Sequence, residues 1–184
     1  SRDSYIDILN IPKSINIGVM INISEIVNAS KNYDKTLKEL FKNQGKSKIK
    51  FIRLATHFSE ISHAVKICKI LKRKKIKVII NLMQITEQKH EEIIDAVKKI
   101  KVVNPSVLYF ADSLGAMNSE DVSRCIKSIR SEWSGEIGIH THNNLGKAVS
   151  NSIEAIKQGA TWIDSTVTGM GRGPGNSETE YILI

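Results

Sequence analysis

The stretch IGIHTHNN, residues 137–144, has the pattern of a short buried strand that ends in two histidines and runs directly into a helix. Side chains two positions apart on a strand point to the same face, so His140 and His142 should project together, away from Ile139 and Thr141. Two adjacent imidazoles can supply two ligands to one divalent metal ion. Core or surface histidines that merely alternate would give the same pattern, and these eight residues alone do not separate the two interpretations.

Five further apolar runs flank this stretch, and segments with helical periodicity separate them. The runs predict strands over residues 16–23, 50–56, 77–82, 107–112 and 162–167. Helices are predicted over 4–9, 34–43 and 145–158, and from Ser59, Thr86, Asn118 and Glu178 onward. Strands that alternate with helices indicate an α/β protein with a parallel sheet. An open doubly wound sheet and a (β/α)8 barrel both fit this order, and six units fill three quarters of a barrel.

Polar residues at the strand ends favour the barrel. In a barrel the carboxyl ends of all strands meet at one mouth, where active sites lie, whereas an open sheet spreads them along a line. The fold class predicted is therefore a (β/α)8 TIM barrel, of which about six βα units are present. The polar strand ends are Thr56, His57, Asn81, Asp112, Ser113, His140, His142, Ser165 and Thr166.

Composition excludes several classes of protein. The chain has 41% apolar and 25% charged residues, as in soluble globular domains, and neither a signal peptide nor a membrane-length apolar run is visible. Cys68 and Cys125 are far apart and form no CxxC motif, which predicts reduced thiols and a cytoplasmic location. The net charge of +8 is densest at Lys72–Lys77. This block lies where a helix ends and has no interleaved aromatic residues, so we expect a solvated surface rather than a nucleic-acid or membrane partner.

The loop GMGRGPGN, residues 169–176, has two interpretations. Glycines after a strand can bring backbone N–H groups to a phosphate. The spacing here is GxGxGxG rather than GxGxxG, however, and Pro174 removes one donor. The sequence therefore favours a tight loop that directs Asn176 toward the barrel mouth. Ser113, before the Gly115 turn, is either a hydroxyl donor to a substrate carboxylate or part of a helix-capping turn.

Together, the run HTHNNLGKAVSNS at residues 140–152 and the loop at 169–176 resemble a known signature. It is that of the 3-hydroxy-3-methylglutaryl-CoA (HMG-CoA) lyase-like, or pyruvate carboxyltransferase, superfamily, also called the DRE-TIM metallolyases. RLATH at 53–57 and ADSLGAM at 111–117 are most similar to the 4-hydroxy-2-oxovalerate aldolase branch. The resemblance extends along nearly the whole chain.

This resemblance implies a metal-dependent aldolase that cleaves or forms a carbon–carbon bond next to a 2-oxo acid through a pyruvate enolate. It implies that His140, His142 and Asn176 bind the ion, with Mn²⁺ expected first and Mg²⁺ or Co²⁺ as alternatives. It also implies that Ser113 and His140 contact the substrate. The implied partners are a small 2-oxo acid and an aldehyde, together with a second copy of the chain or a partner dehydrogenase.

The chain also departs from the family pattern. The lyases carry a cysteine in the glycine loop and the synthases carry Gly-Glu-Arg, whereas this loop has Gly171-Arg172-Gly173. A Claisen-type acyl-CoA synthase and a non-catalytic barrel domain are the alternatives. The family's first strand ends in an Arg-Asp pair that no strand here supplies, so the catalytic residues cannot be assigned. We therefore expect residues 1–184 to be a partial barrel domain, without the first two strands and the C-terminal region, and to be inactive alone.

Overall fold

The computed structural model describes residue 6 and residues 8–29, 32–41 and 47–184. Within this part of the chain, six parallel strands form one sheet, and each strand pairs with the next one in sequence. A doubly wound sheet would reverse its strand order at a switch point, so the consecutive order excludes that alternative. The strands are β1 (Ile17–Asn22), β2 (Ile49–Thr56), β3 (Lys77–Leu82), β4 (Val107–Asp112), β5 (Glu136–Thr141) and β6 (Trp162–Ile163).

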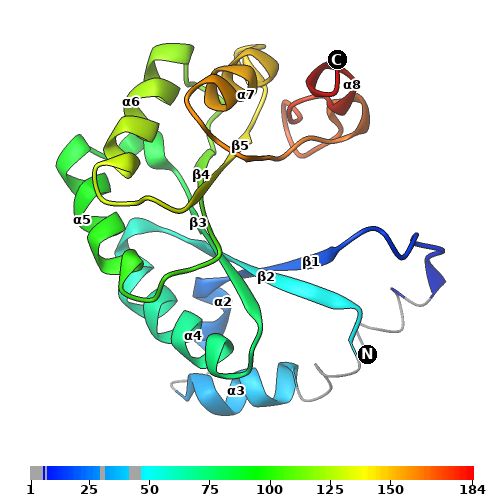
Figure 1. Cartoon of the computed structure of the whole chain (residues 1–184), viewed down its shortest axis with the longest axis vertical. Coiled ribbons are helices and arrows are strands. Elements are labelled where there is room, and N and C mark those ends of the chain that lie inside the picture. Colours follow the sequence, from blue (N-terminus) through cyan, green and yellow to red (C-terminus); the bar gives the residue numbers. More distant parts are fainter. Residues whose placement is uncertain (1–5, 7, 30–31, 42–46) are drawn as a thin grey trace.

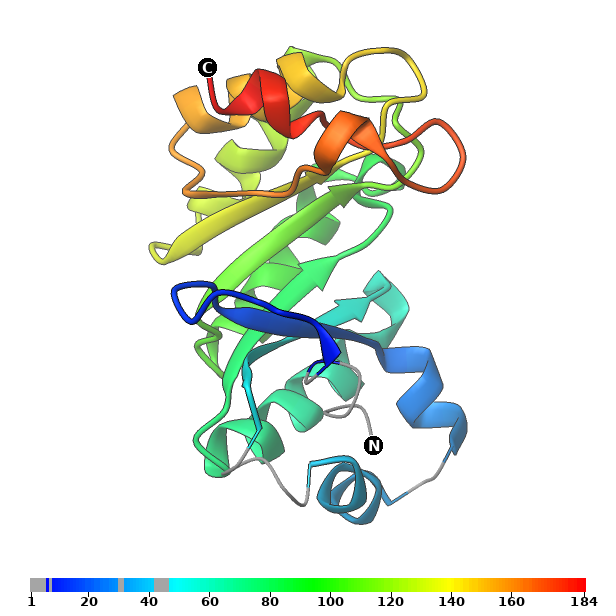
Figure 2. The same ribbon diagram turned by 90° about the vertical axis from the view of Figure 1, so that its right-hand side faces the viewer.

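Helices follow the strands and cover one face of the sheet. Figure 1 shows α4, α5 and α6 on the outer side of the curved sheet, and Figure 2 looks onto the opposite face, with the strands in front of most helices. The predicted α/β partial TIM barrel is therefore confirmed as a half-barrel. The helices are α2 (Ile23–Ala29), α3 (Tyr33–Leu40), α4 (Ile61–Arg73), α5 (His90–Lys101), α6 (Ser119–Arg130), α7 (Ala148–Lys157) and α8 (Thr179–Ile182), with short 3-10 turns at Phe58–Glu60, Ile85–Glu87 and Val167–Gly169.

Alternation along the strands gives the sheet two different faces. On the outer face, side chains such as Ile52 and Leu54 are fully buried against the helices in the main apolar core. On the inner face, Ile79, Val107 and Tyr109 form a second, smaller cluster. An alanine at Gly138 would place its Cβ 2.3 Å from the Tyr109 ring, so this glycine lets the ring lie across β5. The inner face thus has its own packing below the barrel mouth.

Several element boundaries differ from the predictions. The segment after β1 forms α2, a helix that the sequence pattern did not predict. The histidine strand does not run directly into a helix: a turn intervenes, and α7 begins only at Ala148, whose N–H donates to Asn143 Oδ1 at 3.0 Å. The strand predicted over 162–167 ends at Ile163, and the Thr166 N–H donates to the Ser177 carbonyl rather than to β5. The helix expected from Thr86 begins at His90, after a 3-10 turn.

Half of the helix predicted at residues 4–9 and the end of the one at 34–43 lie outside the described residues. Within the part that is described, no helix is both long and apolar enough to cross a bilayer. The basic block lies where predicted, between the end of α4 and the start of β3, and Lys72 Nζ donates to the carbonyl of Val103 at 2.8 Å.

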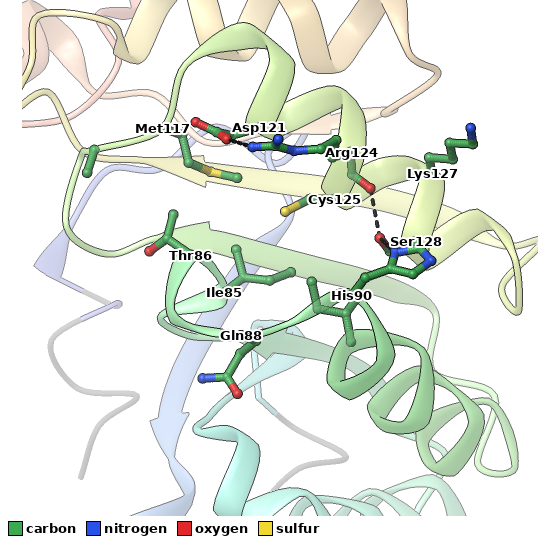
Figure 3. Close-up of a pocket in the computed structure, with 12 residues that line it drawn as sticks. Ile85, Thr86, Gln88, His90, Met117, Asp121, Arg124, Cys125, Lys127 and Ser128 are labelled. Carbon is green, nitrogen blue, oxygen red and sulfur yellow. Dashed lines mark hydrogen bonds and ion pairs between the residues drawn. The ribbon is translucent and has the colours of Figure 1, made fainter.

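Both cysteines lie on helices, as predicted. Burial raises the pKa of Cys68 to about 11 and that of Cys125 to about 12, so both remain protonated thiols at neutral pH. Cys125 lies in a groove between α5 and α6, on the outer surface of the half-barrel (Figure 3). Neither thiol is therefore suited to act as a nucleophile or metal ligand.

Candidate metal centre

A cleft of about 980 Å³ lies on the inner face of the sheet, at the carboxyl ends of the strands. Most of the predicted polar strand ends do converge there. The exceptions are Thr56, Asp112, Ser165 and Thr166, which do not line the cleft. The polar side chains that line it are Asn22, Ser24, Arg53, His57, Asn81, Gln84, Ser113, His140, His142, Asp164, Arg172 and Asn176.

His140 and His142 lie beside each other, as their spacing predicts. Their ring centroids are 4.9 Å apart and the ring planes are almost perpendicular, at 89°. Burial and the nearby His140 imidazole lower the pKa of His142. This shift favours the neutral imidazole, which is the form that binds metal ions.

The glycine loop places Asn176 next to this histidine pair. Asn176 forms an isolated antiparallel bridge with His142, and its own N–H donates to the Gly169 carbonyl at 2.9 Å. A Cβ at Gly171 would come within 2.4 Å of the Asn176 side chain, and one at Gly175, where φ is +85°, within 2.4 Å of the Gly169 carbonyl oxygen. The glycines are therefore needed for the loop to fold back, as the tight-loop interpretation expects.

The side-chain amide of Asn176 is only partly satisfied. Its Nδ2 donates to the Met170 carbonyl at 3.2 Å, but Oδ1 is buried and accepts no hydrogen bond from the described residues. Leaving a buried carbonyl oxygen unpaired costs roughly 1–3 kcal/mol. An unpaired amide oxygen from a residue that lines the same cleft as two imidazoles matches the donor set of a transition-metal ion. Residues 6, 8–29, 32–41 and 47–184 contain no group of three or more His, Cys, Asp or Glu side chains placed to hold a metal ion. These three residues thus fit part of a metal site.

Asp112 and Ser113 each match one of the two roles predicted for this turn, the helix cap and the hydroxyl group at the cleft. Asp112 is fully buried, and its carboxylate accepts the backbone N–H groups of Ala116 at 3.0 Å and Met117 at 3.1 Å. Asp112 therefore holds the capping turn. Ser113 is half-buried at the cleft, where its Oγ accepts the Gln84 N–H at 2.9 Å. His57, one of the predicted polar strand ends, also lines the cleft.

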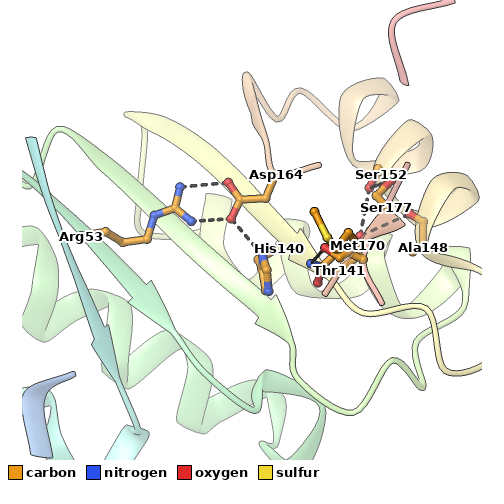
Figure 4. Close-up of polar contacts among 9 residues, drawn as sticks. Arg53, His140, Thr141, Ala148, Ser152, Asp164, Met170 and Ser177 are labelled. Carbon is orange, nitrogen blue, oxygen red and sulfur yellow. Dashed lines mark hydrogen bonds and ion pairs between the residues drawn. The ribbon is translucent and has the colours of Figure 1, made fainter. Parts of the chain in front are cut away.

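A second polar group in the cleft was missed from the sequence. Asp164, just after β6, accepts a hydrogen bond from His140 Nδ1 at 2.9 Å and from Arg53 Nη2 at 2.9 Å, and Arg53 Nη1 also pairs with it (Figure 4). Burial opposes ionisation of Asp164, but the hydrogen bonds from His140 and Arg53 outweigh it and hold its pKa at about 2. A charged residue in β2 and another directly after β6 are a sequence signal that marks both side chains as candidates, although this signal does not pair them.

Behind the site, a buried chain of hydroxyl groups connects the segments that carry the candidate ligands (Figure 4). Ser152 Oγ on α7 lies 3.2 Å from Thr141 Oγ1 and donates to Ser177 Oγ at 3.3 Å. Thr141 lies between the two histidines in sequence, and Ser177 directly follows Asn176. The hydroxyl chain therefore fixes the histidine strand and the asparagine loop to the same helix.

Replacing Ser152 with alanine should lower the free energy of unfolding by about 1–3 kcal/mol, because the two remaining hydroxyls lose their buried partner. Chemical denaturation measures the change. The exposed Ser150 on the same helix is the matched control, and Ser150→Ala should change stability by less than about 0.5 kcal/mol. Equal losses in the two variants would show that the buried chain contributes nothing.

Comparison with known proteins identifies the family of this chain. The model of the HMGL-like family matches residues 15–184. The 4-hydroxy-2-oxovalerate aldolase of Carboxydothermus hydrogenoformans is 36% identical over 134 residues, which are 73% of this chain and 40% of that protein. The aldolase of the same name from Bacillus thuringiensis is 34% identical, over 73% of this chain and 39% of that protein. The chain thus spans about two fifths of the length of these curated relatives.

Solved structures show the same fold at lower sequence identity. HMG-CoA lyase from Brucella melitensis matches with a TM-score of 0.76 and 11% identity, over 99% of this chain and 69% of that one. The carboxyl transferase domain of Rhizobium etli pyruvate carboxylase matches with a TM-score of 0.71 and 12% identity, over 81% of this chain and 26% of that one. At such identities the likeness concerns the fold alone. With a family match over nearly its whole length, the chain belongs to the HMGL-like family.

Proposed function

We propose that the whole protein is a divalent-metal-dependent aldolase that cleaves or forms a carbon–carbon bond next to a 2-oxo acid of the 4-hydroxy-2-oxo acid type. One observation carries the proposal: His140, His142 and the unpaired Oδ1 of Asn176 come together at one cleft. The aldolase names of the relatives at 34–36% identity support this choice of reaction.

In this proposal His140, His142 and Asn176 hold the ion, which supplies Lewis-acid stabilisation for the charge of an enolate. Imidazole ligands suit manganese or another transition ion, whereas magnesium prefers oxygen, so Mn²⁺ is the first candidate. A carboxylate ligand would come from outside the described residues, consistent with the family's Arg-Asp pair.

Ser113 and Arg172 would orient the substrate. Because Ser113 Oγ accepts the Gln84 N–H through a lone pair, its hydroxyl proton remains free to be donated to a substrate carboxylate. Arg172 adds positive charge to the lining of the same cleft. During cleavage the C3–C4 bond breaks and its electron pair stays on C3 as the pyruvate enolate, which later takes a proton. The C4 hydroxyl loses its proton as the aldehyde carbonyl forms.

The whole protein would supply the remaining barrel units. Within the described part of the chain, β1 and β6 each pair with one neighbour only, and the curated relatives are more than twice as long. We therefore propose that residues 1–184 are a partial barrel domain. Expressed alone, this segment should bind Mn²⁺ weakly and show no turnover, and robust pyruvate formation from it would contradict the proposal.

Release of pyruvate from 4-hydroxy-2-oxovalerate by the full-length protein tests the function, with lactate dehydrogenase as the coupling enzyme. Treatment with EDTA should abolish activity and added Mn²⁺ should restore it. Acetyl-CoA should have no effect, because the glycine loop carries no thiol of the acyl-CoA lyase type. Full activity without metal would refute the proposal, and a strict requirement for acetyl-CoA would favour a Claisen-type synthase.

A further inference from the structure

We infer that Asp164 is a positioning residue for the metal centre: held by Arg53, it fixes the His140 ring so that Nδ1 carries the proton and Nε2 is left to bind the ion. This inference rests on the proposed function. It adds two residues, Arg53 and Asp164, that neither the sequence pattern nor the comparisons assign to the site.

The hydrogen-bond geometry assigns the proton. Both carboxylate oxygens of Asp164 face the Arg53 guanidinium, and Oδ2 also lies 2.9 Å from His140 Nδ1 (Figure 4). Arginine stays charged in proteins, and a carboxylate paired with it through both oxygens is an anion that can only accept hydrogen bonds. The shared proton therefore belongs to His140 Nδ1. In a neutral imidazole protonated at Nδ1, the lone pair lies on Nε2.

Packing holds the carboxylate in place. The Arg53 side chain is 15% exposed and the Asp164 side chain 23%. The Arg53 guanidinium lies over the Tyr109 ring, 3.9 Å from its centroid, and Tyr109 is only 1% exposed. The backbone N–H of Asp164 donates to the Ile139 carbonyl at 3.0 Å, next to His140. The arrangement thus includes side chains from β2, β4 and β5 and from the end of β6, and the packing restricts the movement of each.

This arrangement predicts a specific defect for Asp164→Asn. Metal-ligating histidines usually donate their second N–H to a carboxylate or carbonyl, and loss of that partner lowers metal affinity roughly 10- to 100-fold. The amide has the same size as the carboxylate, but it can donate to His140 Nδ1 and so favour the proton on Nε2. We expect Asp164→Asn to bind Mn²⁺ about 10- to 100-fold more weakly while both histidines remain.

Two measurements on the full-length protein test the inference. Electron paramagnetic resonance of free Mn²⁺ gives the dissociation constant for the wild type, Asp164→Asn and the control Asp95→Asn, in which an exposed carboxylate on α5 is changed. Long-range ¹H–¹⁵N spectra of the metal-free protein report the His140 tautomer independently of activity. We expect Nδ1–H in the wild type, a shift toward Nε2–H in Asp164→Asn, and wild-type behaviour in the control.

The outcomes separate this inference from the proposed function. If the wild type does not bind Mn²⁺, the proposed function fails, and the tautomer still shows whether Asp164 orients the ring. If the wild type binds Mn²⁺ but Asp164→Asn binds it equally well with an unchanged tautomer, the inference is wrong. Should the asparagine variant not fold, Asp164→Glu keeps the charge opposite Arg53 but displaces the carboxylate. It should bind Mn²⁺ about 10-fold more weakly, and unchanged affinity would likewise overturn the inference.

Discussion

Replacing both His140 and His142 with alanine should abolish Mn²⁺ binding by the full-length protein and, with it, pyruvate formation. The loss of affinity should exceed the roughly 10- to 100-fold cost of losing an outer-shell partner, because two of the three candidate donors disappear. The donors left would be oxygens, Asn176 Oδ1 and the carboxylate expected from outside the described residues, and both imidazoles that favour a transition ion would be gone. Titration with Mn²⁺, monitored by electron paramagnetic resonance, measures the effect directly.

A matched control removes two histidines from outside the cleft. His63 on α4 lies 2.5 Å from the Tyr33 hydroxyl, and His90 on α5 lies 2.6 Å from Ser128 Oγ. The variant His63→Ala/His90→Ala should therefore bind Mn²⁺ like the wild type. Thermal unfolding of both double variants confirms that they are folded. If the cleft variant binds Mn²⁺ as tightly as the control, the metal assignment is wrong.

The sequence predicts this histidine pair because strand alternation is a local property. His140 and His142 are two residues apart, so their common face follows from backbone geometry alone. The placement of Asn176 also follows from residues close to it in sequence, since the folded loop leaves no room for a side chain at Gly171 or Gly175. The same periodicities predict the sheet and most helices, because each apolar stripe must be buried against a neighbouring element.

The alternation of side chains between the two faces of a strand explains two of the four polar strand ends that were placed wrongly. Arg53 and Tyr109 point to the inner face, so Thr56 and Asp112, three residues further on, must point outward. Both are indeed fully buried on the other side of the sheet. Counting residues along each strand from one known to face inward would have excluded Thr56 and Asp112 from the cleft on the basis of the sequence alone.

The Arg53–Asp164 pair could not be predicted in this way. The two residues are 111 positions apart, and alternation places both on the inner face without saying which residues meet across it. That depends on the curvature of the sheet, which brings β2 toward the end of β6. The alternation is also hard to recognise around Asp164, because regular pairing of the short strand β6 ends at Ile163, one residue earlier.

Replacing Arg53 with methionine should cost about 3 kcal/mol of unfolding free energy at neutral pH, because it leaves the mostly buried carboxylate of Asp164 without its counter-charge. The cost should also depend on pH. The hydrogen bonds from His140 and Arg53 lower the pKa of Asp164 from 3.8 to about 2 despite its burial. A carboxyl group with a lowered folded-state pKa contributes stability that is complete above its unfolded pKa and is lost as the pH falls through its folded pKa.

In the wild type this contribution is about 2 kcal/mol, present above about pH 4 and lost as the pH falls toward 2. In Arg53→Met, burial still raises the pKa of Asp164 but the guanidinium no longer lowers it. The pKa therefore rises, and the contribution of Asp164 to stability becomes smaller. The stability gap between wild type and variant should therefore narrow from pH 4 to pH 2, as measured by guanidinium unfolding. The double variant Arg53→Met/Asp164→Asn should regain part of the loss at pH 7, since no buried charge is then left unpaired. A gap independent of pH, together with a double variant no more stable than Arg53→Met, would mean that Arg53 stabilises the half-barrel only by packing on Tyr109.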